Sequence, residues 1–235
     1  MATVEEAEHR RYERSLERAR VLTLSDGVFA IALTLLVLEL RVPDTRGVSP
    51  AEVLRQSRPS LIAFLISFAV IASAWANHRD LFEVIRLADR NLVWLNLLYL
   101  LPLTMIPFGA ALLSRYEFDP IALSIYGGLL LVIALLRLWI WLYATHRPRL
   151  LFEPVDEDLR KAGVVLVIVP ICLYVVAIVV AQLGKTGAAV SLAIYGLIPV
   201  LYFLTIIFTP PEVRLLEKHR PSSGTVNPGD EPDTH

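Results

Sequence analysis

The sequence predicts an all-α integral membrane protein built as a bundle of six helices. Apolar residues make up 55% of the 235 residues and charged residues 19%, and the mean hydropathy is +0.58. Soluble domains of this size rarely have such a composition. Six stretches each contain about twenty mostly apolar residues, enough to cross the hydrocarbon core of a bilayer as a helix. The charged residues gather between these stretches.

The first span is expected at residues 21–41, because its apolar run is long enough to cross and Pro43 follows it. Residues 1–19 precede it and carry closely spaced Glu and Arg, which is typical of a charged, water-exposed helix. The third span contains Pro102 and Pro107, which are expected to kink it. The later spans are expected at 60–78, 91–114, 120–145, 162–183 and 188–209.

This pattern divides the chain into three parts. A charged segment covers residues 1–19, a membrane domain covers 20–209, and a tail covers 210–235. The tail is too poor in apolar residues to pack and is expected to be largely disordered.

The distribution of basic residues predicts the orientation. With six spans both termini lie on one side of the membrane, and most of the 22 Lys and Arg residues fall in the segments on that side. Basic residues favour the cytoplasmic side. The charged N-terminal segment does not read as a secretory signal peptide. We therefore expect a multi-pass protein of the cell (plasma) membrane with both termini in the cytoplasm.

Several functional classes are disfavoured. Cys172 is the single cysteine and has no partner for a disulfide or a metal site. There is no phosphate-binding glycine loop, catalytic triad spacing or His-Glu-x-x-His motif, so an enzyme and a cofactor are not expected. Basic and aromatic residues do not interleave as a nucleic-acid site requires. A Thr-Val-Gly-Tyr-Gly filter of the potassium-channel type is also absent.

One face of the first span can be read in more detail. Ile31, Leu35 and Leu38 are spaced four and three residues apart and share one side of a helix, with Thr34 beside them. If several copies of this helix surround an axis, the face lines a narrow apolar tube that ions cross only after losing part of their hydration. Taken alone, the periodicity is more typical of ordinary helix packing than of a pore.

A longer motif makes the assignment specific. The stretch that begins at Arg20 and continues through Leu24-Ser25-Asp26-Gly-Val-Phe-Ala-Ile-Ala to Glu39-Leu resembles the first-helix signature of the transmembrane protein 175 family. Trp75-Ala-Asn-His78 resembles the Trp/His motif of that family's second helix. The one departure is Leu24, where the family usually has phenylalanine. The chain has the length of a single-repeat prokaryotic member.

The resemblance implies a function and a set of site residues. Family members are cation channels that conduct potassium without a re-entrant filter, and single-repeat members assemble as homotetramers with helix one lining the pore. By this resemblance Ile31 forms the constriction with Leu35 and Leu38 beyond it, and Thr34 helps to select potassium. The resemblance also implies a polar network that ties helix one to helix two, formed by Arg20, Ser25, Asp26, Trp75 and His78.

Two charged residues invite weaker hypotheses. Glu39 follows Leu38, and four copies would place a negative ring at the mouth of the pore. Alternatively, Glu39 is a solvated helix end paired with Arg41. Arg137 lies about two turns inside the fourth span, where it either snorkels to the interface or anchors a carboxylate between helices.

The sequence therefore predicts passive potassium transport across a lipid bilayer by a homotetrameric channel. One alternative is a cation/proton exchanger that uses Asp26 and His78 as proton sites, because histidine titrates near neutral pH. Another is a non-conducting membrane scaffold, in which the apolar face of helix one would be buried within a single subunit.

Overall fold

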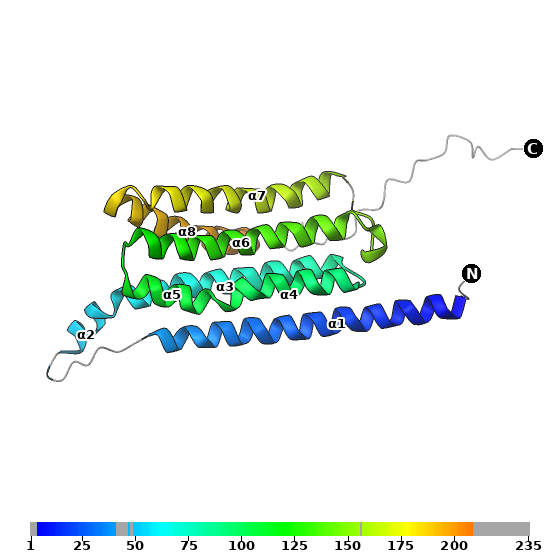
Figure 1. Ribbon diagram of the computed structural model, residues 1–235, viewed down its shortest axis with the longest axis horizontal. Helices are drawn as coiled ribbons and strands as arrows, with labels where there is room; N and C mark the ends of the chain where they lie inside the picture. The colour runs from blue at the N-terminus through cyan, green and yellow to red at the C-terminus, as the bar shows by residue number, and fades with distance from the viewer. Residues whose placement is uncertain (1–3, 41–46, 48, 156, 209–235) are drawn as a thin grey trace, which may run out of the picture.

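The computed structural model describes residues 4–40, 47, 49–155 and 157–208, and this part of the chain is helical throughout apart from its links (Figure 1). The first helix, α1, spans Val4–Leu35 and continues into a 3-10 turn, η1, at Leu36–Glu39. The remaining elements are α2 (Pro50–Gln56), α3 (Arg58–Val84), α4 (Arg90–Thr104), α5 (Ile106–Arg115), α6 (Pro120–Thr145), η2 (Pro148–Leu150), α7 (Glu157–Val180) and α8 (Gly184–Phe208).

Within the described ranges, six segments are long and apolar enough to cross a membrane, which confirms the all-α class with six membrane helices. They are Tyr12–Glu39, Arg58–Val84, Arg90–Arg115, Pro120–Thr145, Arg160–Val180 and Gly184–Leu204. The expected tail at 210–235 and the loop around Pro43 lie outside the described residues.

The first helix is longer than one span. Its 32 residues extend about 48 Å at 1.5 Å per residue, well beyond the roughly 30 Å of hydrocarbon. The expected segments 1–19 and 21–41 are thus joined in one helix, because no helix-breaking residue separates them. The Arg18 guanidinium donates to the carbonyl of Phe82 at 2.7 Å, and the Ala88 amide donates to the carbonyl of Arg14 at 3.2 Å. These bonds hold the N-terminal half of α1 against the last turn of α3 and the α3–α4 link.

The third span is broken where its prolines predicted a kink. Helix α4 ends at Thr104 and α5 begins at Ile106, with Met105 between them. A proline provides no amide donor, and its ring crowds the carbonyl four residues earlier. The hydroxyl of Thr104 donates to the carbonyl of Leu101 at 2.7 Å, satisfying one acceptor near the break.

The second span also exceeds its expected range of 60–78, since α3 continues to Val84. The chain then pairs with the link that follows α6. The Arg86 amide donates to the carbonyl of Leu150 at 2.7 Å, and the Phe152 amide donates to the carbonyl of Val84 at 3.1 Å. Ile85 and Leu150 are fully buried there. The two links therefore close one end of the bundle.

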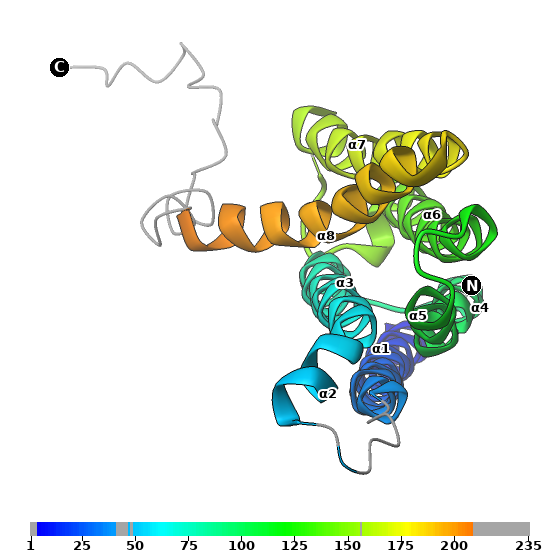
Figure 2. The ribbon, with the colours of Figure 1, turned by 90° about the vertical axis from the view of Figure 1, so that its left-hand side faces the viewer.

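The end-on view shows how the helices are arranged (Figure 2). Helix α1 packs on α3 and α4 at one edge of the bundle, and α7 packs on α6 and α8 at the opposite edge. Aromatic side chains fill much of the core between them, and the largest that are fully buried are Phe29, Phe82, Tyr99, Tyr126 and Tyr195. Helix α1 therefore has one face against the protein and one face without a neighbour among the described residues.

Candidate functional site

The buried face of α1 follows the helical repeat. Val21, Ser25, Phe29, Ala32 and Leu36 are spaced four, four, three and four residues apart, and each is at most 4% exposed. This spacing keeps side chains on one side of a helix. The side chains lie against α3 and α4 and fix the rotation of α1 about its own axis.

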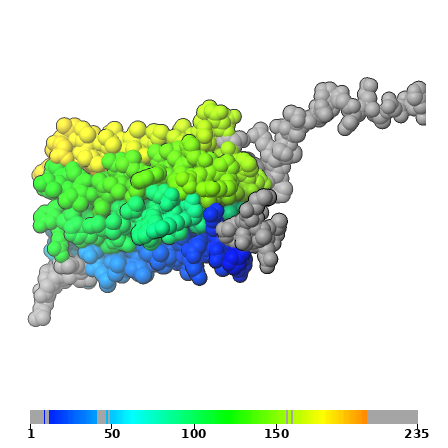
Figure 3. All heavy atoms as spheres, turned by 45° about the vertical axis from the view of Figure 1, so that its right-hand side comes forward, coloured from blue at the N-terminus to red at the C-terminus, as the bar shows by residue number. Residues whose placement is uncertain are grey.

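The opposite face of α1 is exposed and apolar. Ile31 is 60% exposed and Leu38 67%, and Thr34 and Leu35 are exposed beside them. The space-filling view shows α1 as a continuous blue band along one edge of the molecule (Figure 3). The structure thus brings together on one uncovered surface the four residues predicted from the sequence to line a pore.

This surface begins earlier than the sequence reasoning proposed. Leu24 is 50% exposed, and Gly27 is also exposed with nothing within 4 Å of a Cβ built on it. Leu24, Gly27, Ile31, Thr34 and Leu38 are spaced alternately three and four residues apart, which is the repeat of a helix that packs on copies of itself. That alternation was present in the sequence and would have identified Leu24 and Gly27.

The end of this face has a local geometry of its own. Leu38 lies in the 3-10 turn η1, which follows α1 directly and winds more tightly than an α-helix. The hydroxyl of Thr34 donates to the carbonyl of Ile31 at 2.9 Å. Since the proton of this hydroxyl is used within the helix, its oxygen lone pairs remain available to an external cation.

Three helices are joined by a directional chain of hydrogen bonds. Nε2 of His78 on α3 lies 2.8 Å from Oδ1 of Asn96 on α4. Nδ2 of Asn96 donates to Oγ of Ser25 on α1 at 3.0 Å, and that hydroxyl donates to the carbonyl of Val21 at 2.8 Å. An amide oxygen only accepts, so His78 carries its proton on Nε2. All three side chains are at most 2% exposed.

Aromatic rings enclose this chain. The His78 ring stacks on Phe82 with 4.6 Å between centroids and on Tyr99 with 5.6 Å, and Phe29 meets its edge at 5.5 Å. The structure thus places the predicted residues Ser25 and His78 in one network. The sequence reasoning missed Asn96 as their bridge, although an amide within an apolar span is itself a signal of a required hydrogen bond.

A second link between α1 and α3 lies closer to the surface. The indole Nε1 of Trp75 donates to Oδ1 of Asp26 at 2.9 Å. The Arg79 guanidinium lies 5.6 Å from the centre of the Trp75 ring, a cation–π contact that helps to fix the indole. Asp26 and Trp75, both predicted, are therefore direct partners across the α1–α3 interface.

Two further predicted residues lie apart from these links. Arg20 is 75% exposed and forms an ion pair with Glu17 on its own helix, with 2.9 Å between Nη1 and Oε1. Within the described chain, it is not hydrogen-bonded to Ser25 or Asp26. Glu39 is partly buried at the end of η1, and Arg41, its suggested partner, lies outside the described residues.

Comparison with known proteins supports the family resemblance. A family described as the endosomal/lysosomal potassium channel TMEM175 matches residues 20–107, which contain all of the second span and most of the first and third. A potassium channel from Chamaesiphon minutus is 40% identical over 147 residues, covering 60% of this chain and 72% of the relative. A potassium channel from Streptomyces collinus is 31% identical over 191 residues, covering 79% and 91%.

A more distant human relative carries a different name. It is called an endosomal/lysosomal proton channel and is 26% identical over 148 residues, covering 61% of this chain and 29% of its own length. These relatives are named as channels, which agrees with the expectation that the chain is not an enzyme.

A solved structure extends the match to the fold. The crystal structure of a lysosomal potassium-selective channel TMEM175 homologue from Chamaesiphon minutus superimposes with a TM-score of 0.71 at 31% identity. The match covers 80% of this chain and 97% of that one. With its six membrane helices and its identity to bacterial potassium channels over most of their length, the chain is a multi-pass membrane protein that belongs to the TMEM175 channel family.

Proposed function

We propose that this protein is a potassium-permeable channel in which four copies surround a pore lined by α1. The hydrophobic constriction is formed by Ile31, Leu35 and Leu38, and potassium crosses it passively without a re-entrant filter. The names of the bacterial relatives support potassium as the permeating ion. The uncovered face of α1 supports its assignment as the helix that lines the pore.

The observation that carries this proposal is the contrast between the two faces of α1. Ile31 and Leu38 are more than half exposed in the single chain, while Phe29 and Leu36 are almost completely buried. Lipid could cover the apolar side chains, but it would not explain Gly27 and Thr34 in the same stripe. Small and hydroxylated residues at three- and four-residue spacing suit close approach between helices.

The constriction would act through dehydration. A ring of branched aliphatic side chains offers no ligand to a cation, so an ion must lose part of its water shell to pass. The Thr34 oxygens would replace some of the lost water ligands. This layer would favour potassium, which is more weakly hydrated than sodium. Glu39 would add negative charge at one mouth and attract cations.

Potassium flux into liposomes tests the proposal. Ile31→Asn and Leu35→Asn should raise flux and weaken ion preference, because a polar ring removes the dehydration barrier. Val176→Asn is a matched control on α7, where Val176 is 48% exposed, because α7 lies at the opposite edge of the bundle from α1 (Figure 2). If the α1 variants behave like Val176→Asn, these residues do not form the constriction.

The orientation is part of the same proposal. The excess of basic residues on the side of the termini supports cytoplasmic termini and a position in the cell (plasma) membrane. In this orientation Glu39 faces the outside and the Asp26–Trp75 link lies nearer the cytoplasm.

A second candidate is proton permeation or cation/proton exchange, which the name of the human relative favours. Asp26 is exposed beside the α1 face. His78 is 2% exposed and surrounded by rings, which argues against it as a proton site on an aqueous path in this conformation. Flux strictly coupled to a pH gradient would favour exchange.

The exposed α1 face argues against the scaffold, which needs that face buried within the subunit.

A further inference from the structure

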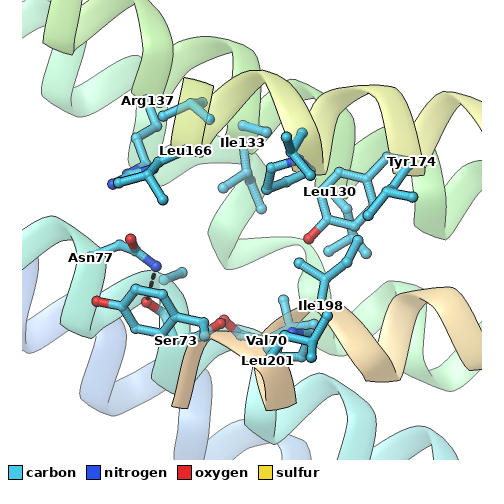
Figure 4. A pocket seen from close by; sticks show the side chains of 18 of the residues that line it. Val70, Ser73, Asn77, Leu130, Ile133, Arg137, Leu166, Tyr174, Ile198 and Leu201 are labelled. Carbon is cyan, nitrogen blue, oxygen red and sulfur yellow. Dashed lines mark hydrogen bonds between the residues drawn. The ribbon is translucent and has the colours of Figure 1, made fainter. Parts of the chain in front are cut away.

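A cavity of about 360 Å³ lies away from α1, between α3, α6, α7 and α8. Its size is within the range of small-molecule sites. Most of its lining is aliphatic or aromatic, and the few polar groups include Ser73, Asn77 and Arg137. The close-up shows that the two ends differ (Figure 4). Arg137 and Asn77 lie at one end, and Tyr174 and Ile198 lie at the other.

Arg137 lacks a bonded counter-ion in this cavity. Its Nε atom is buried and without a hydrogen-bond partner, and the guanidinium forms no ion pair among the described residues. Asp80 is a nearby carboxylate, but both its oxygens already accept hydrogen bonds. Oδ1 accepts one from Arg79 at 2.8 Å, and Oδ2 accepts one from Tyr202 at 3.0 Å. An unpaired positive charge at this depth is costly unless an anion joins it.

The cavity opens at the outer surface of the helix bundle. Leu166 on α7 is 70% exposed and Leu201 on α8 is 46% exposed, and both line it. In the end-on view the last turns of α8 point away from α7 (Figure 2). Arg137 lies eight residues before Thr145, the last residue of α6, which is about 12 Å along the helix axis. A flexible arginine at this depth reaches the headgroup region.

We propose that this cavity binds one acidic phospholipid from the surrounding leaflet. Arg137 pairs with the phosphate, which suits the planar fork of a guanidinium. One acyl chain enters between α7 and α8 and lies along Leu130, Tyr174 and Ile198. The site has a cationic end and an apolar end, as an anionic amphiphile requires. Lipid binding here does not depend on the proposed ion or on the pore.

Native mass spectrometry of the purified full chain tests this proposal. Phosphatidylglycerol and phosphatidylcholine with the same acyl chains are supplied together. We expect wild type to retain phosphatidylglycerol with a preference of about tenfold, which corresponds to about 1.4 kcal/mol. Arg137→Gln should abolish the preference, and Arg149→Gln, which removes an exposed arginine near the same end, should preserve it. Equal retention of the two lipids by wild type, or an unchanged preference in Arg137→Gln, would overturn the proposal.

A second pair of variants tests the cavity without changing charge. Ala134 lines the cavity, so Ala134→Phe should fill it and reduce phosphatidylglycerol retention. Leu135→Phe adds bulk on the neighbouring exposed residue and should have no effect. If Ala134→Phe binds phosphatidylglycerol as wild type does, the acyl chain is not in this cavity. Inorganic phosphate should fail to displace the lipid, and displacement by phosphate would mean that the site binds a free anion.

Stability separates a ligand-binding arginine from a structural one. In detergent without acidic lipid, Arg137→Met should melt at or above the wild-type temperature, because it removes a charged group whose buried Nε atom lacks a hydrogen-bond partner. Added phosphatidylglycerol should raise the melting temperature of wild type and leave that of Arg137→Met unchanged. A lower melting temperature for Arg137→Met in lipid-free detergent would show that Arg137 is held by the protein itself, and the proposal would fail.

Discussion

Nε2 of His78 lies 2.8 Å from Oδ1 of Asn96, and this pair joins the second and third spans at a fully enclosed point. Asn96 also donates to Ser25 on α1, so a single amide holds three helices in register. Removing one member leaves the other buried polar atoms without partners, which costs more than the bond itself contributes.

Asn96→Leu should therefore destabilise the protein by about 1–3 kcal/mol. The measurement is the thermal midpoint in detergent, followed by intrinsic fluorescence. Ser25→Ala should lose less stability than Asn96→Leu. The double variant should lose less stability than the sum of the two single losses, because both single variants remove the same Asn96–Ser25 bond. Thr23→Ala is the control, since Thr23 is exposed and donates only to its own helix, at the carbonyl of Ala19. Additive losses would show that Asn96 and Ser25 act independently.

The Asp26–Trp75 bond predicts which substitutions at these two positions cost the most stability. Trp75→Phe removes the indole donor and keeps an aromatic ring, so Asp26 loses its partner and the α1–α3 contact should weaken by about 1 kcal/mol. Asp26→Asn retains an oxygen acceptor and should be milder than Asp26→Leu. Thermal melts of the three variants check this order. If Asp26→Asn is as damaging as Asp26→Leu, the charge matters more than the hydrogen bond.

Two adjacent glycines on α6 give a matched test of helix packing. A Cβ built on Gly127 clashes with Oη of Tyr195, whose hydroxyl donates to the carbonyl of Leu123 at 3.0 Å. Gly127→Ala should force α6 and α8 apart, at a cost of about 1–3 kcal/mol. Gly128→Ala meets nothing within 4 Å and should be neutral or slightly stabilising.

Thermal melting of these two variants provides the comparison. Both carry the same added methyl group in the same helix, so intrinsic helix propensity cancels between them. Equal melting temperatures would mean that α6 and α8 do not pack as closely as the structure shows.

The Thr34 hydroxyl predicts an effect on ion preference rather than on stability. Thr34→Val keeps the shape and removes the oxygen, and should reduce the preference for potassium over sodium. Thr34→Ser keeps the hydroxyl and should preserve it. Flux measured in liposomes with potassium on one side and sodium on the other gives the ratio of potassium to sodium permeability. Unchanged selectivity in Thr34→Val would place the hydroxyl outside the ion path.

The membrane helices could be predicted from the sequence because length and apolar composition suffice for a span. A kink near Met105 was expected from Pro102 and Pro107, because a proline has no amide donor and its ring crowds the preceding turn. Helix ends were less predictable. Helix α3 continues past His78 into polar sequence because its last turns pack on the α6–α7 link, a contact between segments far apart in the chain.

The candidate site was only partly predictable. The outward face of α1 follows from its periodicity, whereas the bridge through Asn96 depends on which helices meet. Arg137 was expected to snorkel or to anchor a carboxylate. The structure places it at a cavity with no carboxylate bonded to it among the described residues, because Asp80 is held by Arg79 and Tyr202.

Cysteine accessibility tests most directly whether α1 lines the pore. The background is Cys172→Ser, since Cys172 is the only cysteine and is exposed. In this background, Ile31→Cys, Leu38→Cys and the α7 control Val176→Cys are treated with a cationic methanethiosulfonate during potassium flux. We predict that flux falls at least about tenfold for the two α1 variants. The positively charged group attached to the cysteine would repel potassium ions in the dehydrating constriction. Unchanged flux in both α1 variants after confirmed labelling would contradict the account.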